Sequence, residues 1–224
     1  MKKIAVFGAG GFGREVHMLI DQINDKKITY EFIGYFDDTY ETGVIINDFP
    51  ILGGVKELNQ WAEPLELVCA VGDPTDKKSI IENVKNKNVS YPILIHPNAL
   101  IGNMKFNSIG EGSIITAGVV ITVNIVIGKH VILNLACTVG HDTIIGDYSS
   151  FMPTVNISGE VVIEKGVYVG TGAQIINKLT IGENTIVGAG SVVAKALPPN
   201  CTAVGIPAKP IKFHKNTKHE TLVD

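Results

Sequence analysis

His141 and Asp142 are adjacent residues whose side chains can move a proton at neutral pH. Histidine titrates near neutrality, so an uncharged imidazole can take a proton from a nucleophile. The carboxylate of Asp142 adds a negative charge that favours the protonated imidazole, although adjacent side chains often point apart. The pair predicts a general base with an acidic helper.

A second candidate site is the glycine-rich stretch Gly8–Gly13, Gly-Ala-Gly-Gly-Phe-Gly, which follows an apolar run and precedes a helical pattern. The spacing matches the G-x-G-x-x-G loop, in which the backbone and the next helix face a phosphate. Asp37 and Asp38 end the next apolar run, where an acid can bind ribose hydroxyls. These residues predict a nucleotide site. Tight strand–helix packing and a solvated turn are alternatives that need no ligand.

The first half of the chain, residues 1–95, alternates apolar runs with helical patterns, which is typical of a small parallel α/β domain. We expect strands over 3–8, 30–36, 66–71 and 91–95, and helices over 12–24, 55–60 and 75–87. A phosphate loop alone would suggest NAD. This domain, however, leaves no room for an oxidoreductase catalytic domain.

The second half, residues 96–211, repeats with a period of six. An apolar residue occupies every sixth position: Ile109, Ile115, Ile121, Ile127, Leu133, Val139, Ile145, Phe151, Ile157, Ile163, Val169, Ile175, Ile181, Val187 and Val193. The residue four places on is usually small or β-branched, and glycine often follows the apolar residue, where it would permit a turn with positive φ. This period fits short strands that stack into coils around a continuous core.

Composition excludes several classes of protein. The 224 residues carry a net charge of −3, so there is no electrostatic case for nucleic acid or an anionic membrane. No apolar run is long enough for a membrane span, and the glycines and charges near the N-terminus argue against a signal peptide. Three scattered cysteines fit a reducing cytoplasm.

The period of six resembles the hexapeptide repeat of the left-handed parallel β-helix acyltransferases. The glycine loop followed by this repeat resembles, over nearly the whole chain, the bacterial nucleotide-amino-sugar N-acetyltransferases of the bacillosamine pathway and the related sialic acid O-acetyltransferases. The resemblance implies a small Rossmann-like domain followed by a left-handed β-helix. It also implies transfer of an acetyl group from acetyl-CoA to a UDP- or dTDP-linked 4-amino-4,6-dideoxy sugar for surface glycan.

The same resemblance assigns residues. His141 and Asp142 would be the base and its helper, and Asn134 a polar active-site residue. The nucleotide sugar would be held by Gly10, Gly11, Phe12, Asp37, Asp38 and Gly72. Acetyl-CoA would be contacted by Ser150, Gly159, Thr171, Ala189, Pro207 and Lys209, although close relatives have a second histidine where this chain has Ser150.

Relatives of this fold are trimers with acetyl-CoA between neighbouring β-helices. We therefore expect a homotrimer, because flat faces rich in Val, Ile and Thr should be buried against a partner. Residues 212–224 predict a mobile polar tail. Cys137 is predicted to lie in the core, His96 to be structural, and His130 to lie on the surface.

Three alternatives stay open. Within the same enzyme class, the chain would O-acetylate sialic acid or a related glycan. In another class it would be a non-catalytic nucleotide-sugar-binding scaffold. A carbonic-anhydrase-like relative would need a three-histidine metal site, and only His130 and His141 lie in the repeat, so we expect no metal.

Overall fold

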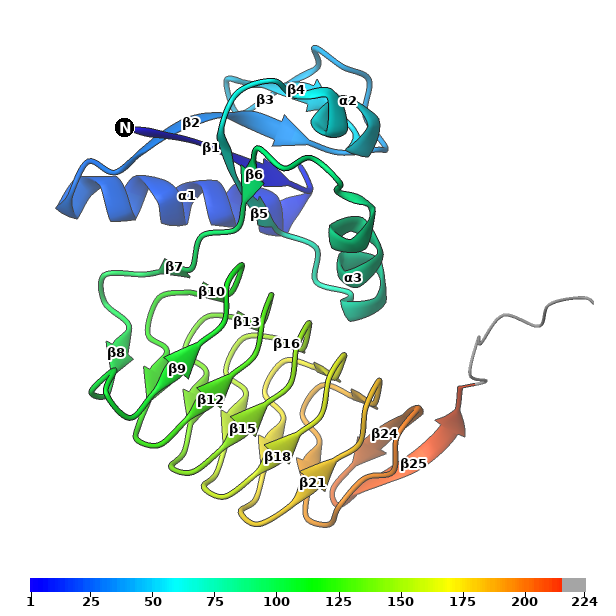
Figure 1. Ribbon diagram of the computed structural model, residues 1–224. Coiled ribbons are helices and arrows are strands. Elements are labelled where there is room, and N and C mark those ends of the chain that lie inside the picture. Colours follow the sequence, from blue (N-terminus) through cyan, green and yellow to red (C-terminus); the bar gives the residue numbers. More distant parts are fainter. Residues whose placement is uncertain (215–224) are drawn as a thin grey trace, which may run out of the picture.

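The structure is a computed structural model that describes residues 1–214, and it consists of an α/β unit followed by a parallel β-helix (Figure 1). The α/β unit contains a six-stranded sheet in the order β3-β4-β2-β1-β5-β6. Helix α1 packs on one side of the sheet, and α2 and α3 on the other. The elements are β1 (Lys2–Phe7), α1 (Gly11–Lys26), β2 (Tyr30–Phe36), β3 (Ile45–Ile46), β4 (Phe49–Gly53), α2 (Val55–Gln60), β5 (Leu65–Cys69), α3 (Pro74–Asn83) and β6 (Val89–Ser90).

Strand β1 lies in the middle of this sheet and pairs in parallel with β2 and β5. Its residues Ile4, Ala5 and Val6 are fully buried because helices cover both sides of the sheet. This explains why the strand reads as a continuous apolar run. The predicted Rossmann-like domain is confirmed.

The β-helix has three faces, each a stack of short parallel strands. Face 1 contains β7 (Leu94–Ile95), β10 (Ile114–Ile115), β13 (Ile132–Leu133), β16 (Ser150–Phe151), β19 (Tyr168–Val169), β22 (Ile186–Val187), β24 (Cys201–Gly205) and the antiparallel β25 (Ala208–Phe213). Face 2 contains β8 (Leu100–Ile101), β11 (Val120–Ile121), β14 (Thr138–Val139), β17 (Asn156–Ile157), β20 (Gln174–Ile175) and β23 (Val192–Val193). Face 3 contains β9 (Ser108–Ile109), β12 (Val126–Ile127), β15 (Ile144–Ile145), β18 (Val162–Ile163) and β21 (Thr180–Ile181).

The stacked strands pair in register at a spacing of 18 residues, as Ile114 does with Ile132. Each coil therefore contains three hexapeptides, and residues 18 apart occupy the same position in successive coils. From Ile115 to Val193 the predicted apolar positions are at most 2% exposed, and the partner position four residues on is also buried at Ser113, Cys137 and Ala173. The predicted parallel β-helix is confirmed.

The glycines that follow the apolar positions have a different role from the predicted one. Gly128, Gly140 and Gly146 do not have positive φ. A Cβ on Gly140 would lie 2.6 Å from the backbone nitrogen of Gly159, so the close approach of the next coil excludes a side chain. Positive φ instead occurs at every sixth residue from Gly112 to Gly190, where the chain turns a corner.

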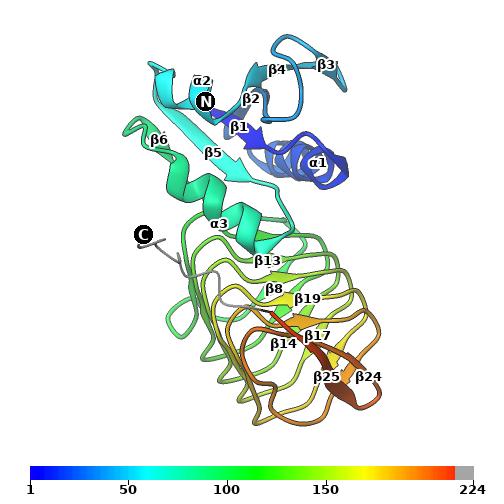
Figure 2. The ribbon, with the colours of Figure 1, turned by 90° about the vertical axis from the view of Figure 1, so that its right-hand side faces the viewer.

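The α/β unit packs on face 1 (Figure 2). Ile114 and Ile132 on the outer side of face 1 share a buried cluster with Val16, Leu19 and Ile20 of α1. Face 1 is therefore covered over its first coils, whereas faces 2 and 3 are not covered by the α/β unit.

Some boundaries differ from those predicted. Helix α3 ends at Asn83 instead of continuing to Lys87, and of the predicted strand 91–95 only Leu94–Ile95 forms, as the first strand of face 1. The hairpin β3–β4 was not predicted. Of the predicted tail, Lys212 and Phe213 belong to β25, and residues 215–224 lie outside the described residues.

Candidate active site

His141 lies at the corner where the chain passes from β14 on face 2 to β15 on face 3. Its Nδ1 is 2.8 Å from Oδ2 of Asp142. A carboxylate only accepts hydrogen bonds, so Nδ1 carries the proton and Nε2 keeps a free lone pair. The His141 side chain is 55% exposed. The corner therefore presents an accessible base in the tautomer that accepts a proton at Nε2.

Asn124 completes this corner and was missed in the sequence. It precedes Asp142 by 18 residues, which places it at the same position one coil earlier, and its Nδ2 donates a hydrogen bond to Oδ1 of Asp142 at 2.9 Å. Hydrogen bonds from His141 and Asn124 lower the pKa of Asp142. The carboxylate therefore stays ionised and is held from both sides. The spacing of 18 residues is the signal that finds Asn124.

The glycine loop between β1 and α1 contains two kinds of glycine. A Cβ on Gly13 would overlap the carbonyl oxygen of Gly8, so Gly13 is needed for strand–helix packing. A Cβ on Gly10 or Gly11 would have no neighbour within 4 Å. Both residues are exposed at the start of α1, where backbone N–H groups lack helical acceptors. Gly10 and Gly11 are the positions where a phosphate has room, and Phe12 packs against the core.

Asp37 and Asp38 follow β2, and their carboxylates hold backbone groups. Asp37 accepts a hydrogen bond from the Ala9 N–H of the glycine loop at 2.8 Å, and Asp38 accepts one from the Val55 N–H at 2.8 Å. Next to them is an open pocket of about 690 Å³ lined by residues that include Asp37, Asp38, Thr39, Val71, Asp76 and Ser79. Asp76 and Ser79 of α3 were not among the predicted site residues.

The residues predicted to bind acetyl-CoA do not converge in one chain. Gly159 lies beside His141 at the corner of faces 2 and 3. Thr171 and Ala189 are exposed at the corner of faces 1 and 2, and Pro207 and Lys209 belong to the β24–β25 hairpin. These positions occupy two corners and one end of the prism.

Asn134 and the glycine loop are likewise separated from His141. Asn134 precedes β14 and His141 follows it, so they lie at different corners, and Asn134 is only 6% exposed with its Oδ1 accepting the Leu135 N–H. The α/β unit with the glycine loop sits on face 1, whereas His141 lies at the corner that joins the other two faces. Gly72, before α3, lies 4.0 Å from Met152 Cε when given a Cβ, so it also faces the face 1 side.

Two sequence expectations are corrected here. His130 was expected on the surface but is 3% exposed, because Tyr91 and Tyr148 cover its ring at centroid distances of 4.9 and 5.5 Å. Ser150 was expected to contact acetyl-CoA, but it is fully buried under α3, where its Oγ accepts a hydrogen bond from Lys77 Nζ at 2.7 Å. Cys137 is fully buried in the core, as predicted.

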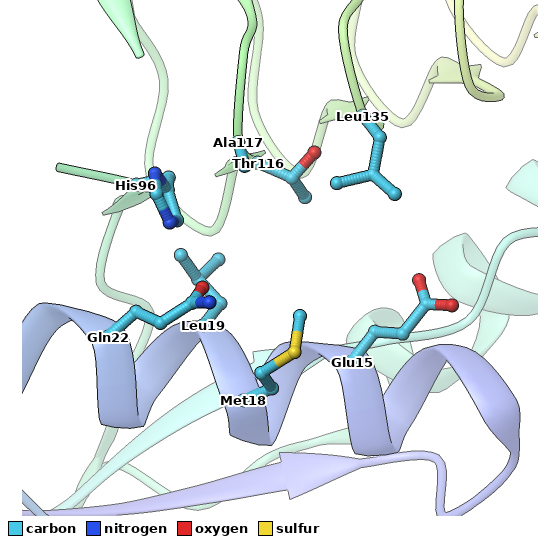
Figure 3. Close-up of a pocket in the computed structure, with 8 residues that line it drawn as sticks. All are labelled: Glu15, Met18, Leu19, Gln22, His96, Thr116, Ala117 and Leu135. Carbon is cyan, nitrogen blue, oxygen red and sulfur yellow. The ribbon is translucent and has the colours of Figure 1, made fainter. Parts of the chain in front are cut away.

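A smaller pocket, with about 260 Å³ of empty space, separates α1 from the β-helix corner (Figure 3). Met18 of α1 and Leu135 of the corner point into it from opposite sides. His96 accepts the Asn98 N–H at Nδ1, so its own proton is on Nε2, and burial lowers its pKa. The lining is mostly apolar, so this pocket is a junction between the two units and offers little to a phosphate.

Among residues 1–214, no three His, Cys, Asp or Glu side chains cluster in a way that would hold a metal ion. None of the three described helices has the length and apolar character needed to cross a membrane.

Comparison with known proteins agrees with both units. Residues 3–84 match the model of the PglD N-terminal domain family, and residues 160–195 match the bacterial transferase hexapeptide model of six repeats. The chain is 31% identical over 218 residues to GDP-perosamine N-acetyltransferase from Escherichia coli O157:H7, an alignment that covers 95% of this chain and 97% of the relative.

Solved structures have the same architecture over 94% of this chain. The acetyltransferase domain of PglB from Neisseria gonorrhoeae FA1090 is 33% identical, with a TM-score of 0.85 and complete coverage of that chain, and it has also been solved with acetyl coenzyme A. PerB from Caulobacter crescentus, solved with CoA and GDP-perosamine, is 28% identical, with a TM-score of 0.80 and 97% coverage of that chain.

Proposed function

The chain belongs to the hexapeptide-repeat nucleotide-amino-sugar N-acetyltransferases, and from this premise we propose that it acetylates the 4-amino group of a nucleotide-linked 4-amino-4,6-dideoxy sugar in surface glycan synthesis. It is an acetyl-CoA-dependent acetyltransferase. The observation that carries the proposal is the exposed His141 base, held by Asp142 on a fold whose other unit has an open glycine loop.

The proposed chemistry needs one base. The sugar amine attacks the carbonyl carbon of the acetyl thioester, and Nε2 of His141 takes a proton from the amine nitrogen. The tetrahedral intermediate then collapses with cleavage of the C–S bond. The imidazolium returns the proton to the departing CoA sulfur, so the enzyme ends in its starting state. Asp142 stabilises the imidazolium and fixes its orientation.

We infer that the working site is shared between two chains of a homotrimer. The glycine loop sits on the face 1 side, and His141 lies at the corner opposite that face, so one chain does not bring them together. Beside this corner, the outer side of face 3 exposes Val126 (49%), Ile144 (48%) and Val162 (37%). A row of exposed aliphatic side chains on a flat sheet is a surface suited to a partner.

In this trimer, the corner with His141 and Gly159 from one chain would face the corner with Thr171 and Ala189 from its neighbour. Acetyl-CoA would lie between them. The measurement is the molar mass by light scattering at assay concentration. A mass near 72 kDa, three times the 24.0 kDa chain, supports the shared site, and a fully active monomer contradicts it.

The nucleotide of the donor sugar is the finer part of the proposal. The sequence resemblance favours UDP or dTDP, whereas two relatives described above act on or bind GDP-perosamine. The pocket beside Asp37 and Asp38 is roomy enough for a nucleoside. We therefore propose GDP-, UDP- and dTDP-linked amino sugars as the substrate panel.

The test is release of free CoA thiol from acetyl-CoA with each amino sugar of this panel. The matching 4-hydroxy sugars serve as controls, because they differ only at the accepting atom. Turnover with an amino sugar but not with its 4-hydroxy counterpart supports N-acetylation. Turnover with sialic acid or a hydroxy sugar alone would make the enzyme an O-acetyltransferase, and no turnover with any acceptor would contradict the proposal.

A further inference from the structure

Lys77 of α3 is a buried lysine that the acetyl transfer does not use. The residue is 1% exposed, and its Nζ donates a hydrogen bond to Oγ of Ser150, which is fully buried on β16. Lysine is almost never this buried unless it is paired, because removing an amine from water is costly. Burial lowers its pKa to about 7. The bond joins the α/β unit to the β-helix over a sequence separation of 73 residues.

The helix that carries Lys77 is also a wall of the nucleotide pocket. Asp76, Ser79 and Ile80 of α3 line the pocket of about 690 Å³ opposite Asp37 and Asp38. Lys77 lies between these pocket residues in sequence, but its side chain is directed at face 1 of the β-helix. One helix therefore has one side on the pocket and another side fastened to the β-helix.

The loop before α3 is held at the same place. Asp73 caps the helix by accepting hydrogen bonds from the N–H groups of Thr75 and Asp76 at 2.8 and 3.0 Å. The adjacent Gly72 lies near Met152, which follows Ser150 by two residues in the same coil. The contact at Met152 is apolar and non-directional, whereas the Lys77–Ser150 bond has a defined length and direction. That bond is the contact that fixes where the helix sits along the β-helix.

We propose that Lys77 is a positioning residue that couples the nucleotide pocket to the acyl-transfer unit through its hydrogen bond to Ser150. This inference rests on the proposed function, because it takes the pocket beside α3 as the nucleotide-sugar site. Without the bond, α3 loses its fixed position and the pocket wall with Asp76 and Ser79 is no longer pre-arranged for the substrate. The acetyl-CoA surfaces and His141 lie elsewhere and do not depend on it.

The test compares Lys77→Met, Ser150→Ala and the double variant by steady-state kinetics with both substrates varied. Lys77→Met keeps the apolar stem and removes the donor. We expect each single variant to raise KM for the nucleotide sugar by about 2- to 10-fold, the equivalent of one hydrogen bond. The double variant should be no worse than the single variants, because both remove the same bond. kcat and KM for acetyl-CoA should stay at wild-type values.

Lys78→Met is the matched control. Lys78 is the next residue of α3, its side chain is 49% exposed, and it pairs only with Glu82 of the same helix. It should leave all kinetic constants unchanged. If Lys77→Met does not fold, Ser150→Ala reports on the same bond.

Two results would overturn the inference: an unchanged KM for the nucleotide sugar in both single variants, or strictly additive effects in the double variant. A purely structural role would lower the melting temperature without the selective change in KM. The wild-type enzyme separates this from the proposed function, since absence of turnover in the wild type contradicts the function itself, whatever the variants do.

Discussion

The imidazole of His141 lies over the α-carbon of Gly159, the residue at the same corner position one coil further along. A Cβ added to Gly159 would be 2.6 Å from Cε1 of the ring, well inside van der Waals contact. Gly159 does not have positive φ, so its backbone conformation is open to any residue. The glycine is therefore needed for the space it leaves to the histidine.

Gly159→Ala should displace the His141 ring while the coil stays folded. A misplacement of about 1 Å can cost on the order of 10²-fold in rate, so we expect kcat to fall by about 10- to 100-fold. Steady-state kinetics and a thermal melt on the same sample measure both effects. In a His141→Asn background the same substitution should cost nothing further, and an additional loss of equal size there would mean that Gly159 acts independently of the ring.

His141→Asn keeps a polar side chain but removes the proton acceptor. Loss of a general base typically costs about 10²- to 10⁴-fold, and we expect this loss in kcat, with both KM values little changed. The melting temperature should hardly move, since the side chain is 55% exposed. Asn177→Ala, at the same corner two coils further on, is the control and should be fully active. A variant that retains more than a tenth of wild-type kcat with chemistry rate-limiting excludes His141 as the base.

Asn124→Gly tests the residue that orients Asp142. Asn124 has a φ of 58°, so glycine avoids the strain that alanine would add. Loss of its hydrogen bond should lower kcat by about 3- to 10-fold, less than removal of the base. Asn184→Gly is a matched control, because Asn184 has a φ of 54° and its side chain pairs with Asn200 instead. Equal effects of the two substitutions on kcat would assign the loss to the backbone.

Gly11→Val places a side chain where a phosphate has room. No atom lies within 4 Å of a Cβ at this position, so the variant should fold. We expect a raised KM for the nucleotide sugar, an unchanged KM for acetyl-CoA, and loss of the rise in melting temperature that a binding nucleotide sugar gives the wild type. NAD should give no rise in either protein. A melting shift with NAD alone would favour a dinucleotide site.

Lys77 should make stability depend on pH. It faces Cys69 and Asp73 from its own unit and Ser150 and His130 from the β-helix, and desolvation lowers its pKa from 10.5 to about 7. Between these values the unfolded chain holds the proton and the folded chain does not, so the free energy of unfolding rises with pH by at most about 1.4 kcal/mol per unit. Urea unfolding of the wild type and Lys77→Met from about pH 6 to about pH 9 measures this. Parallel curves for the two proteins would contradict it.

The β-helix was predictable because its repeat is a direct record of its core. Fifteen apolar residues at one spacing leave few other folds, and the register of 18 then follows from three hexapeptides in a coil. The glycines after these residues were misinterpreted because sequence spacing does not distinguish a turn from a close approach. Only the stacked coils show that Gly140 faces Gly159.

The site was predictable where the chemistry is local and not where it depends on packing between units. His141 and Asp142 are neighbours in sequence and pair directly. The burial of His130 and Ser150 depends on residues 39 and 73 positions away, Tyr91 and Lys77, which meet them only when the α/β unit docks on face 1. No local pattern in the repeat carries that information.

The 18-residue register also sets the geometry of the enzyme in discrete steps. Inserting one hexapeptide before His141 would move it to the next corner, while inserting a whole coil would keep its corner and carry it about 4.8 Å along the axis, the spacing of paired strands. The distance between the acetyl-transfer corner and the docked nucleotide pocket can thus be lengthened only in units of one coil. In proteins built this way, the reach between two binding sites behaves like a ruler with fixed divisions, and a longer or shorter substrate is matched by adding or removing whole coils.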